Sequence, residues 1–341
     1  MSISGLNFAR TCPAPLCHPA LASRRISMSG TSLSDSTSGR LSPALALNRS
    51  PRLGWIAGLV TVIIWAFWMV GTRHAVTHDL PPAAVGIVRF AVPALLLAPA
   101  VWRRGFWPKD LPFRTKLGLL CSGAPFFLIV ATGMESAPAA DIGPLLPGTM
   151  PLFVALIGYL VLGETLGRTR LFGFAMILLA VLCVAGPSLL GAGNGAWRGH
   201  LLLLSGACLW GIFTHAYKRS RLTALQAAGL VGLWSLALLL PLGGPALVRA
   251  AGDGLADAIL VQAVLQGFLS GVVGLVLYGY AIDRLGASRA AALSPLGPVL
   301  AAILAIPLLG EIPSLNAVLG IGLATLGVLL ASGIFAAKEK A

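Results

Sequence analysis

Residues 151–186 read PLFVALIGYLVLGETLGRTRLFGFAMILLAVLCVAG, and residues 298–333 read PVLAAILAIPLLGEIPSLNAVLGIGLATLGVLLASG. Ten of the 36 aligned columns are identical, at an offset of 147 residues. Each segment carries a Leu-Gly-Glu triplet, which ends at Glu164 in the first and at Glu311 in the second. Matched proline and glutamate are rare coincidences in so apolar a background. The two segments therefore indicate an internal duplication.

The composition is that of a membrane protein. Apolar residues make up 57% of the 341 residues, charged residues only 10%, and the mean hydropathy is +0.88. Soluble domains carry about 25% charged residues. Apolar runs of about 20 residues, enough to cross a bilayer as a helix, recur along the chain. They predict an all-α polytopic membrane protein with ten transmembrane helices, at 53–72, 82–101, 115–134, 139–162, 171–190, 199–217, 225–247, 259–282, 288–309 and 313–336.

The basic residues are distributed unequally across these spans. Twenty of the 24 Lys and Arg residues fall on one side, while Arg73, Arg198 and Arg249 fall on the other and Arg89 lies within a span. The positive-inside rule then places both termini in the cytoplasm. Arginine outnumbers lysine by 19 to 5, which favours a GC-rich bacterial genome and hence a bacterial inner membrane. The net charge of +13 is explained by topology and requires no nucleic-acid partner.

The duplicated unit contains five spans. We assign the first repeat to residues 53–190 and the second to residues 197–336, with 191–196 between them. A unit with an odd number of crossings ends on the side opposite its start, so its copy is inverted. Glu164 is then expected at the cytoplasmic end of the fourth span, and Glu311 at the outer end of the ninth.

The two ends of the chain lie outside the repeats. Residues 1–50 are rich in Ser, Pro, Ala and Arg and have no periodicity, so we expect a disordered cytoplasmic tail. Met28 is an alternative start, because nothing before it has a structural pattern. Residues 337–341 are expected to form a short cytoplasmic C-terminal tail.

Several motifs resemble those of the drug/metabolite transporter superfamily, specifically the EamA family. They are the stretch 147–186 with its Leu-Gly-Glu triplet, the stretch 278–333 with Tyr-Gly-Tyr-Ala at its start and Ala-Ala-Ala-Leu-Ser-Pro at 290–295, and Arg89 between Val and Phe. The resemblance covers roughly residues 53–336. It implies ten helices in two inverted five-helix repeats around a central cavity. It also implies export of small organic solutes, often amino acids and related metabolites.

Arg89 is the most informative charged residue. It lies about seven residues inside the second span, roughly 10 Å deep at 1.5 Å per residue. Arginine at membrane depth faces a cavity or an acidic partner. We expect its partners to be Glu135 and Asp141, at the outer ends of spans three and four, in a cluster with Arg73 and His74. Such a cluster is either a site for a substrate carboxylate or a coupled proton, or a static salt bridge between helices.

Other candidate residues follow from the repeat. Glu164 and Glu311 are either gate residues or structural helix ends. Proline removes a backbone donor, and in a membrane the freed carbonyl must be satisfied by protein or by a wet cavity. We therefore expect kinked helices that line a path at Pro147, Pro151, Pro295 and Pro298. Aromatic rings facing the same path, or packing in the bundle, are expected at Trp65, Trp210 and Tyr280.

The sequence excludes several function classes. It contains no HExxH, no P-loop and no GxSxG motif, so we expect neither an enzyme nor an ATP-driven pump. The five cysteines form no CxxC pair, and no metal or cofactor is expected. The function predicted is secondary transport of a small molecule by alternating access, with possible proton coupling. A drug, nucleoside or nucleotide sugar is the alternative substrate, an intramembrane enzyme or a channel is a remote alternative, and the oligomeric state stays open.

Overall fold

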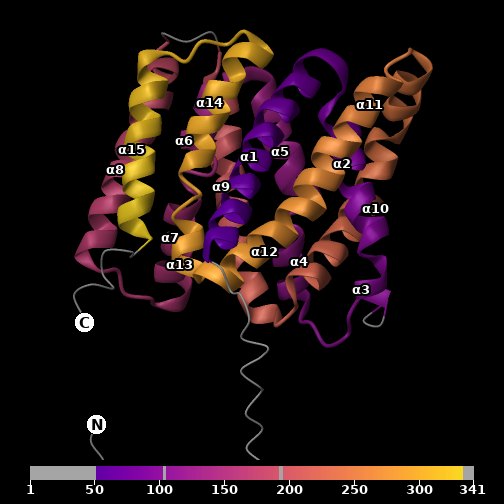
Figure 1. Cartoon of the computed structure of the whole chain (residues 1–341), viewed down its shortest axis with the longest axis horizontal. Helices are drawn as coiled ribbons and strands as arrows, with labels where there is room; N and C mark the ends of the chain where they lie inside the picture. Colours follow the sequence, from indigo (N-terminus) through magenta and orange to yellow (C-terminus); the bar gives the residue numbers. More distant parts are fainter. Residues whose placement is uncertain (1–50, 103–104, 192–194, 333–341) are drawn as a thin grey trace, which may run out of the picture. The chain divides into compact units, whose positions relative to one another are not determined.

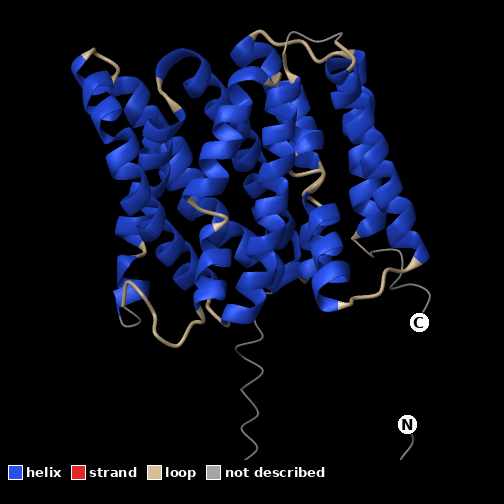
Figure 2. Cartoon of the chain, turned by 180° about the vertical axis from the view of Figure 1, so that it is seen from behind, coloured by secondary structure: helices blue, strands red, loops and turns tan. Residues whose placement is uncertain are grey.

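The computed structural model describes residues 51–102, 105–191 and 195–332, and these form helices and no strand (Figure 2). The expected tails at 1–50 and 337–341, with Met28, lie outside the described residues, as do residues 192–194 of the segment 191–196 between the repeats. Eight helical segments are long and apolar enough to cross a membrane, and two further apolar helices are shorter, Pro82–Leu96 and Leu315–Ala331. The elements are α1 (Pro51–His74), η2 (Ala75–Asp79), α2 (Pro82–Leu96), α3 (Ala98–Trp102), α4 (Phe113–Leu120), α5 (Ala124–Ser136), α6 (Ala139–Leu145), α7 (Met150–Leu162), α8 (Arg168–Leu189), α9 (Trp197–Ser220), α10 (Ala224–Gly252), α11 (Ala256–Gln262), η3 (Ala263–Val273), α12 (Gly274–Leu285), α13 (Ala287–Ala291), α14 (Leu296–Leu309) and α15 (Leu315–Ala331).

The Leu-Gly-Glu triplets end two helices in the same way. Gly163 after α7 and Gly310 after α14 both adopt left-handed backbone, with φ of 66° and 68°. The next amide in each repeat reaches back along the helix, from Glu164 N to Gly158 O at 3.1 Å and from Glu311 N to Ala305 O at 3.3 Å. This is the Schellman cap, which favours glycine because other residues are strained at positive φ. The duplicated triplet is therefore a helix-ending device that places a carboxylate just past each cap.

The two repeats also break one helix at corresponding places. A turn at 146–149, which contains Pro147, separates α6 from α7, and a turn at 292–295, which contains Pro295, separates α13 from α14. Pro151 and Pro298 then stand in the first turns of α7 and α14, where their missing N–H costs no helical hydrogen bond. Discontinuous helices are a common feature of secondary-transporter folds.

Helix packing follows the repeat. Helix α8 packs along α15, and α2 along α10, so each pair joins equivalent helices of the two repeats (Figure 1). Packing of α1 against α12 and α14 is matched by packing of α9 against α5 and α7. At the α8–α15 contact, a Cβ on Gly173 would stand 2.7 Å from the carbonyl oxygen of Gly327, so only glycine permits this approach. Exchange of the two repeats thus preserves these packed pairs.

The apolar side chains divide between a buried core and an apolar exterior. One core cluster centres on Phe127, Leu230 and Leu239 and another on Phe126, Met134 and Leu203, all almost fully buried. Large apolar side chains are also exposed on many helices, among them Leu160, Leu182 and Leu242. An exterior this apolar fits a lipid environment and not water.

The helix caps make a stability prediction. Gly310→Ala is expected to lower the free energy of unfolding by about 1–2 kcal/mol, because a Cβ is strained at left-handed backbone. Gly322→Ala is the matched control, since Gly322 is helical, exposed, and has no heavy atom within 4 Å of its would-be Cβ. Thermal unfolding in detergent compares the two variants, and equal effects would contradict the cap.

Candidate functional site

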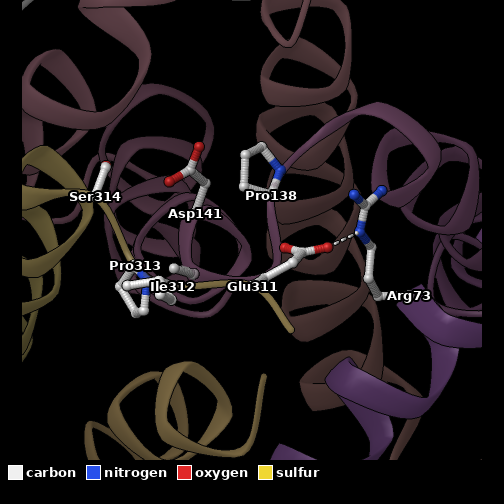
Figure 3. Close-up of a pocket in the computed structure, with 8 residues that line it drawn as sticks. Arg73, Pro138, Asp141, Glu311, Ile312, Pro313 and Ser314 are labelled. Atoms are coloured by element: carbon white, nitrogen blue, oxygen red, sulfur yellow. Dashed lines mark hydrogen bonds and ion pairs between the residues drawn. The ribbon is translucent and has the colours of Figure 1, made fainter. Parts of the chain in front are cut away.

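Arg73 and Glu311 join four helical segments at one end of the bundle. Arg73 Nε lies 3.0 Å from Glu311 Oε1, and Glu311 Oε2 accepts the N–H of Ala139 at 2.6 Å. Arg73 Nη1 also donates to the carbonyl of Met134. The end of α1, the end of α5, the start of α6 and the cap of α14 are thereby tied together (Figure 3). We call this end the Glu311 end.

A cavity lies beside this ion pair. Its volume is about 360 Å³, and its lining includes three charged residues, Arg73, Asp141 and Glu311. The remaining lining residues are Pro138, Ala140, Ile312, Pro313 and Ser314. The cavity therefore combines one cation with two carboxyl groups at the mouth of the bundle.

Asp141 forms a buried row with two residues that the sequence analysis did not select. His200 Nε2 lies 2.9 Å from Asp141 Oδ2, and His200 Nδ1 lies 3.0 Å from Ser188 Oγ. Asp141, His200 and Ser188 are 8%, 3% and 6% exposed, so water does not replace these contacts. The three residues come from α6, α9 and α8, and the row therefore crosses from the first repeat to the second.

Arg89 lies among aromatic rings. Its guanidinium carbon stands 5.0 Å from the ring centre of Trp68, 5.8 Å from that of Phe90 and 5.5 Å from that of Phe127. Its one hydrogen bond among the described residues is to Gln266 Oε1, at 3.3 Å. No carboxylate of the described part of the chain pairs with it.

Gln266 links Arg89 to α1. Its Nε2 donates to Thr72 Oγ1 at 2.8 Å and to Gln262 Oε1 at 3.1 Å, and the side chain is fully buried. Gln262 in turn donates to the carbonyl of Gly71 at 3.2 Å. Gln266 belongs to the π-helix η3, and π-helical segments occur frequently at functional sites. Thr72 and Gln262 thus fix the side chain of Gln266, whose Oε1 is the only acceptor bonded to Arg89 among the described residues.

The expected outward cluster is therefore divided in the structure. Arg89 contacts neither Glu135 nor Asp141, because α2 packs against α10 and η3 and turns residue 89 towards Gln266. Glu135 is exposed at the end of α5. His74 pairs with Asp79 at 3.4 Å, with side-chain exposures of 47% and 24%. Asp141 and Arg73 do lie near each other, because both line the cavity beside the ion pair.

The two repeated glutamates differ in their surroundings. Glu311 is held by Arg73 and Ala139, whereas Glu164 is exposed after the cap of α7. The loop after α14 and the connection from α7 to α8 lie at opposite ends of the bundle, at the top and bottom of Figure 1. We call the latter the Glu164 end. The sequence repeat is thus symmetric, and the contacts made by its carboxylates are not.

The aromatic candidates lie in ring clusters. Trp65 stands 5.2 Å from the ring centre of Tyr278, and Trp210 stands 5.5 Å from Phe126. The Arg284 guanidinium carbon lies 4.8 Å from the Tyr280 ring centre. All three candidate rings are half-buried.

Two polar pairs were missed on the sequence. Gln262 and Gln266, four residues apart in an otherwise apolar span, share one helix face, so their spacing was a readable signal. His200 and Ser188 gave no local signal, since they meet only through the packing of α8 on α9. Among the described residues, no group of three His, Cys, Asp or Glu side chains could hold a metal ion.

Comparison with known proteins agrees with this architecture. The model of the EamA-like transporter family matches residues 52–186 and again residues 197–333. This chain belongs to that family. The probable terminal-alkyne amino-acid exporter of Streptantibioticus cattleyicolor is 28% identical over 280 residues, covering 80% of this chain and 91% of the relative. The probable amino-acid metabolite efflux pump of Salmonella typhimurium is 25% identical over 267 residues, covering 76% and 87%.

A solved structure shares the fold. It is a crystal structure that aligns with a TM-score of 0.50 at 18% identity, covering 83% of this chain and 98% of that chain. The family and the apolar helices make this an integral membrane transporter protein. The substrate of this family member has to be inferred from the residues described above.

The Glu311 end makes an energetic prediction. Arg73→Met and Glu311→Gln are each expected to destabilise the protein, and the double variant less than their sum, with a coupling of about 0.5–3 kcal/mol. The reason is that each single change leaves its partner without compensation. The more exposed pair, probed by His74→Gln and Asp79→Asn, should couple by at most about 1 kcal/mol. Thermal unfolding of both cycles measures this, and additive effects at Arg73 and Glu311 would contradict the tie.

Proposed function

We propose that this protein is a secondary transporter that exports small metabolites bearing a carboxylate, with amino acids and their derivatives as the substrate class. The observation that carries the proposal is Arg89, a cation inside the bundle with no carboxylate partner among the described residues. A buried charge without a counter-ion costs several kcal/mol, so a chain keeps one where a ligand compensates it.

The surroundings of Arg89 fit an anionic ligand. The guanidinium has five N–H donors, of which one is bonded to Gln266 in the described structure. Trp68, whose ring the guanidinium faces, has a buried indole N–H with no hydrogen-bond partner among the described residues. A carboxylate accepts both kinds of donor and pairs with arginine in a two-bond fork. The rings of Trp68, Phe90 and Phe127 then offer apolar surface to the rest of the solute.

The relatives support the same substrate class. Two of them carry names that specify an amino-acid exporter and an amino-acid metabolite efflux pump. Amino acids carry a carboxylate, and Arg89 has no carboxylate partner among the described residues. The chemistry of the site and the names of the relatives therefore agree. Nucleotide sugars and phosphate esters carry more negative charge than a single buried arginine balances.

We further propose ten spans in two inverted repeats. The eight long helical segments are completed by α2 with α3 and by α15, because α2 packs along its equivalent α10 and α15 along its equivalent α8, and both of these are long segments. The excess of basic residues on one side supports cytoplasmic termini in a bacterial inner membrane, with the Glu164 end inside and the Glu311 end outside.

Alternating access follows from the unequal glutamates. Glu311 is bound by Arg73 and by the N–H of Ala139, while Glu164 is exposed. In this proposal, the helices are therefore held together at the outer, Glu311 end and are not held together by Glu164 at the inner end. Trp65 of α1 and Trp210 of α9 correspond between the repeats at an offset of 145 residues. At the same offset the residue equivalent to Arg73 is Lys218, which is exposed. In the opposite conformation Glu164 is expected to pair with Lys218 while Glu311 leaves Arg73.

Transport by Arg89 variants tests the substrate proposal. Arg89→Gln is expected to lower counterflow of labelled amino acids in proteoliposomes by about 10- to 100-fold, because a hydrogen bond to a charged group contributes about 1.5–3 kcal/mol. Arg89→Lys should restore only part of it, since lysine keeps the charge without the fork. Amino-acid methyl esters, which lack the carboxylate, should not compete in the wild type.

Arg249→Gln is the matched control, since Arg249 is exposed at the end of α10 and should leave counterflow unchanged. Membrane abundance is measured for every variant. Equal losses of abundance and transport in Arg89→Gln, or competition by methyl esters as strong as by free amino acids, would contradict the proposal.

A further inference from the structure

The row of Asp141, His200 and Ser188 has a hydrogen-bond arrangement that depends on its protonation. Ser188 Oγ lies 2.9 Å from the carbonyl oxygen of Ala185 and 3.0 Å from His200 Nδ1. A hydroxyl has a single proton to donate, so Ser188 cannot donate to both. The direction of its one bond therefore decides which ring nitrogen of His200 carries a proton.

Two arrangements satisfy the observed distances. When Ser188 donates to Ala185, His200 Nδ1 must carry a proton and donate to Ser188. His200 Nε2 and Asp141 Oδ2, 2.9 Å apart, then share one further proton, and the row is neutral overall. When Ser188 donates to His200 Nδ1, that nitrogen is bare, Nε2–H donates to an ionised Asp141, and the row has one proton fewer and a charge of −1.

We propose that this row is a proton-binding site that couples transport to the proton gradient. The inference rests on the proposed function, since it assigns the energy source of that same transporter. The loaded row holds one proton between Asp141 and His200, and release of that proton turns the Ser188 hydroxyl from Ala185 to His200. The three residues are 8%, 3% and 6% exposed, so the change in charge occurs in a medium that favours the neutral, fully bonded state.

The row is placed to act on the Glu311 end. Asp141 lines the cavity that Arg73 and Glu311 also line. With the proton bound, Asp141 and His200 compensate each other and Arg73 stays with Glu311. With the proton released, the ionised row competes with Glu311 for Arg73, which weakens the tie between α1 and α14.

Other charged and titratable groups surround the row at this end of the described helices. They come from α1, α5, α9 and the loop after α14, and are Arg73, His74, Glu135, Arg198 and Glu311. Arg73 and Glu311 compensate each other, His74 pairs with Asp79, and Glu135 is exposed. None of these is hydrogen-bonded to His200, whose two ring nitrogens are taken by Asp141 and Ser188.

Nitrogen-15 NMR of the full chain in detergent, with labelled histidine, tests the site directly. The His200 resonances are assigned by their loss in His200→Gln. We expect Nδ1 to be protonated at low pH and bare at high pH, as the spectra are followed across the pH range in which the wild type stays folded. Ser188→Ala should alter this transition, and His78→Gln, an exposed histidine bonded within its own helix, should not. A His200 Nδ1 that keeps one state across this range overturns the proposal.

Proteoliposomes test the coupling, with a labelled mixture of the protein amino acids as the probe. An imposed pH gradient should drive accumulation in the wild type at least tenfold above the equal-pH level. His200→Gln should lose this accumulation but keep counterflow at equal pH, which needs no net proton movement, and His78→Gln should keep both.

The outcomes separate the two proposals. Wild-type counterflow with no effect of the gradient, or gradient-driven accumulation that survives in His200→Gln, overturns proton coupling alone. Absence of wild-type counterflow for every labelled amino acid contradicts the proposed substrate class, while the NMR result still decides whether the row binds a proton.

Discussion

The tie between Glu311, Arg73 and the N–H of Ala139 is the interaction on which the rest of the arrangement depends. It exists because a glycine in left-handed backbone ends α14 and turns the next residue, a carboxylate, towards the ends of α1 and α6. A partly buried carboxylate is stabilised by donors, and the two that Glu311 finds, Arg73 and the N–H of Ala139, come from helices far apart in sequence. The local cap of α14 thereby leads to a contact between the two repeats. The same cap recurs at Glu164, where no such contact is made in the present conformation.

The low polarity of the bundle makes each of its other buried polar residues informative about function. A bilayer supplies no water to satisfy buried groups, so each one is either bonded within the protein or waits for a ligand or a proton. Gln262, Gln266 and Thr72 satisfy one another and anchor one donor of Arg89. The remaining donors of Arg89 and the indole N–H of Trp68 have no partner in the described part of the chain, and in the proposed function they bind the solute. Asp141, His200 and Ser188 are fully bonded, but in two alternative ways that differ by one proton.

Much of this fold could be predicted from the sequence, because hydropathy, charge asymmetry and a repeated triplet act along the chain and need no tertiary information. The family relationship was readable for the same reason. The partners of Arg89 were not, because the rotation of α2 is decided by its packing on α10 and η3. Asp141 was selected as an acidic partner of Arg89 at the outer end of the fourth span, yet its partner is His200, 59 residues away and in the other repeat. The sequence thus identified charged residues that matter individually, and the structure was needed to show which of them meet.

Spin-label distances at the two ends of the bundle test the central claim, that the ends close alternately around Glu311 and Glu164. Labels at the exposed residues Ser136 and Leu315 report on the Glu311 end, and labels at Thr165 and Lys218 report on the Glu164 end. Because Lys218 is the expected partner of Glu164, the second pair is repeated with Arg219, also exposed, in its place. Shifting the population with Arg73→Met, which removes the tie, is predicted to lengthen the first distance and shorten the second. Changes in the same direction at both ends, or none at the Glu164 end, would contradict the account.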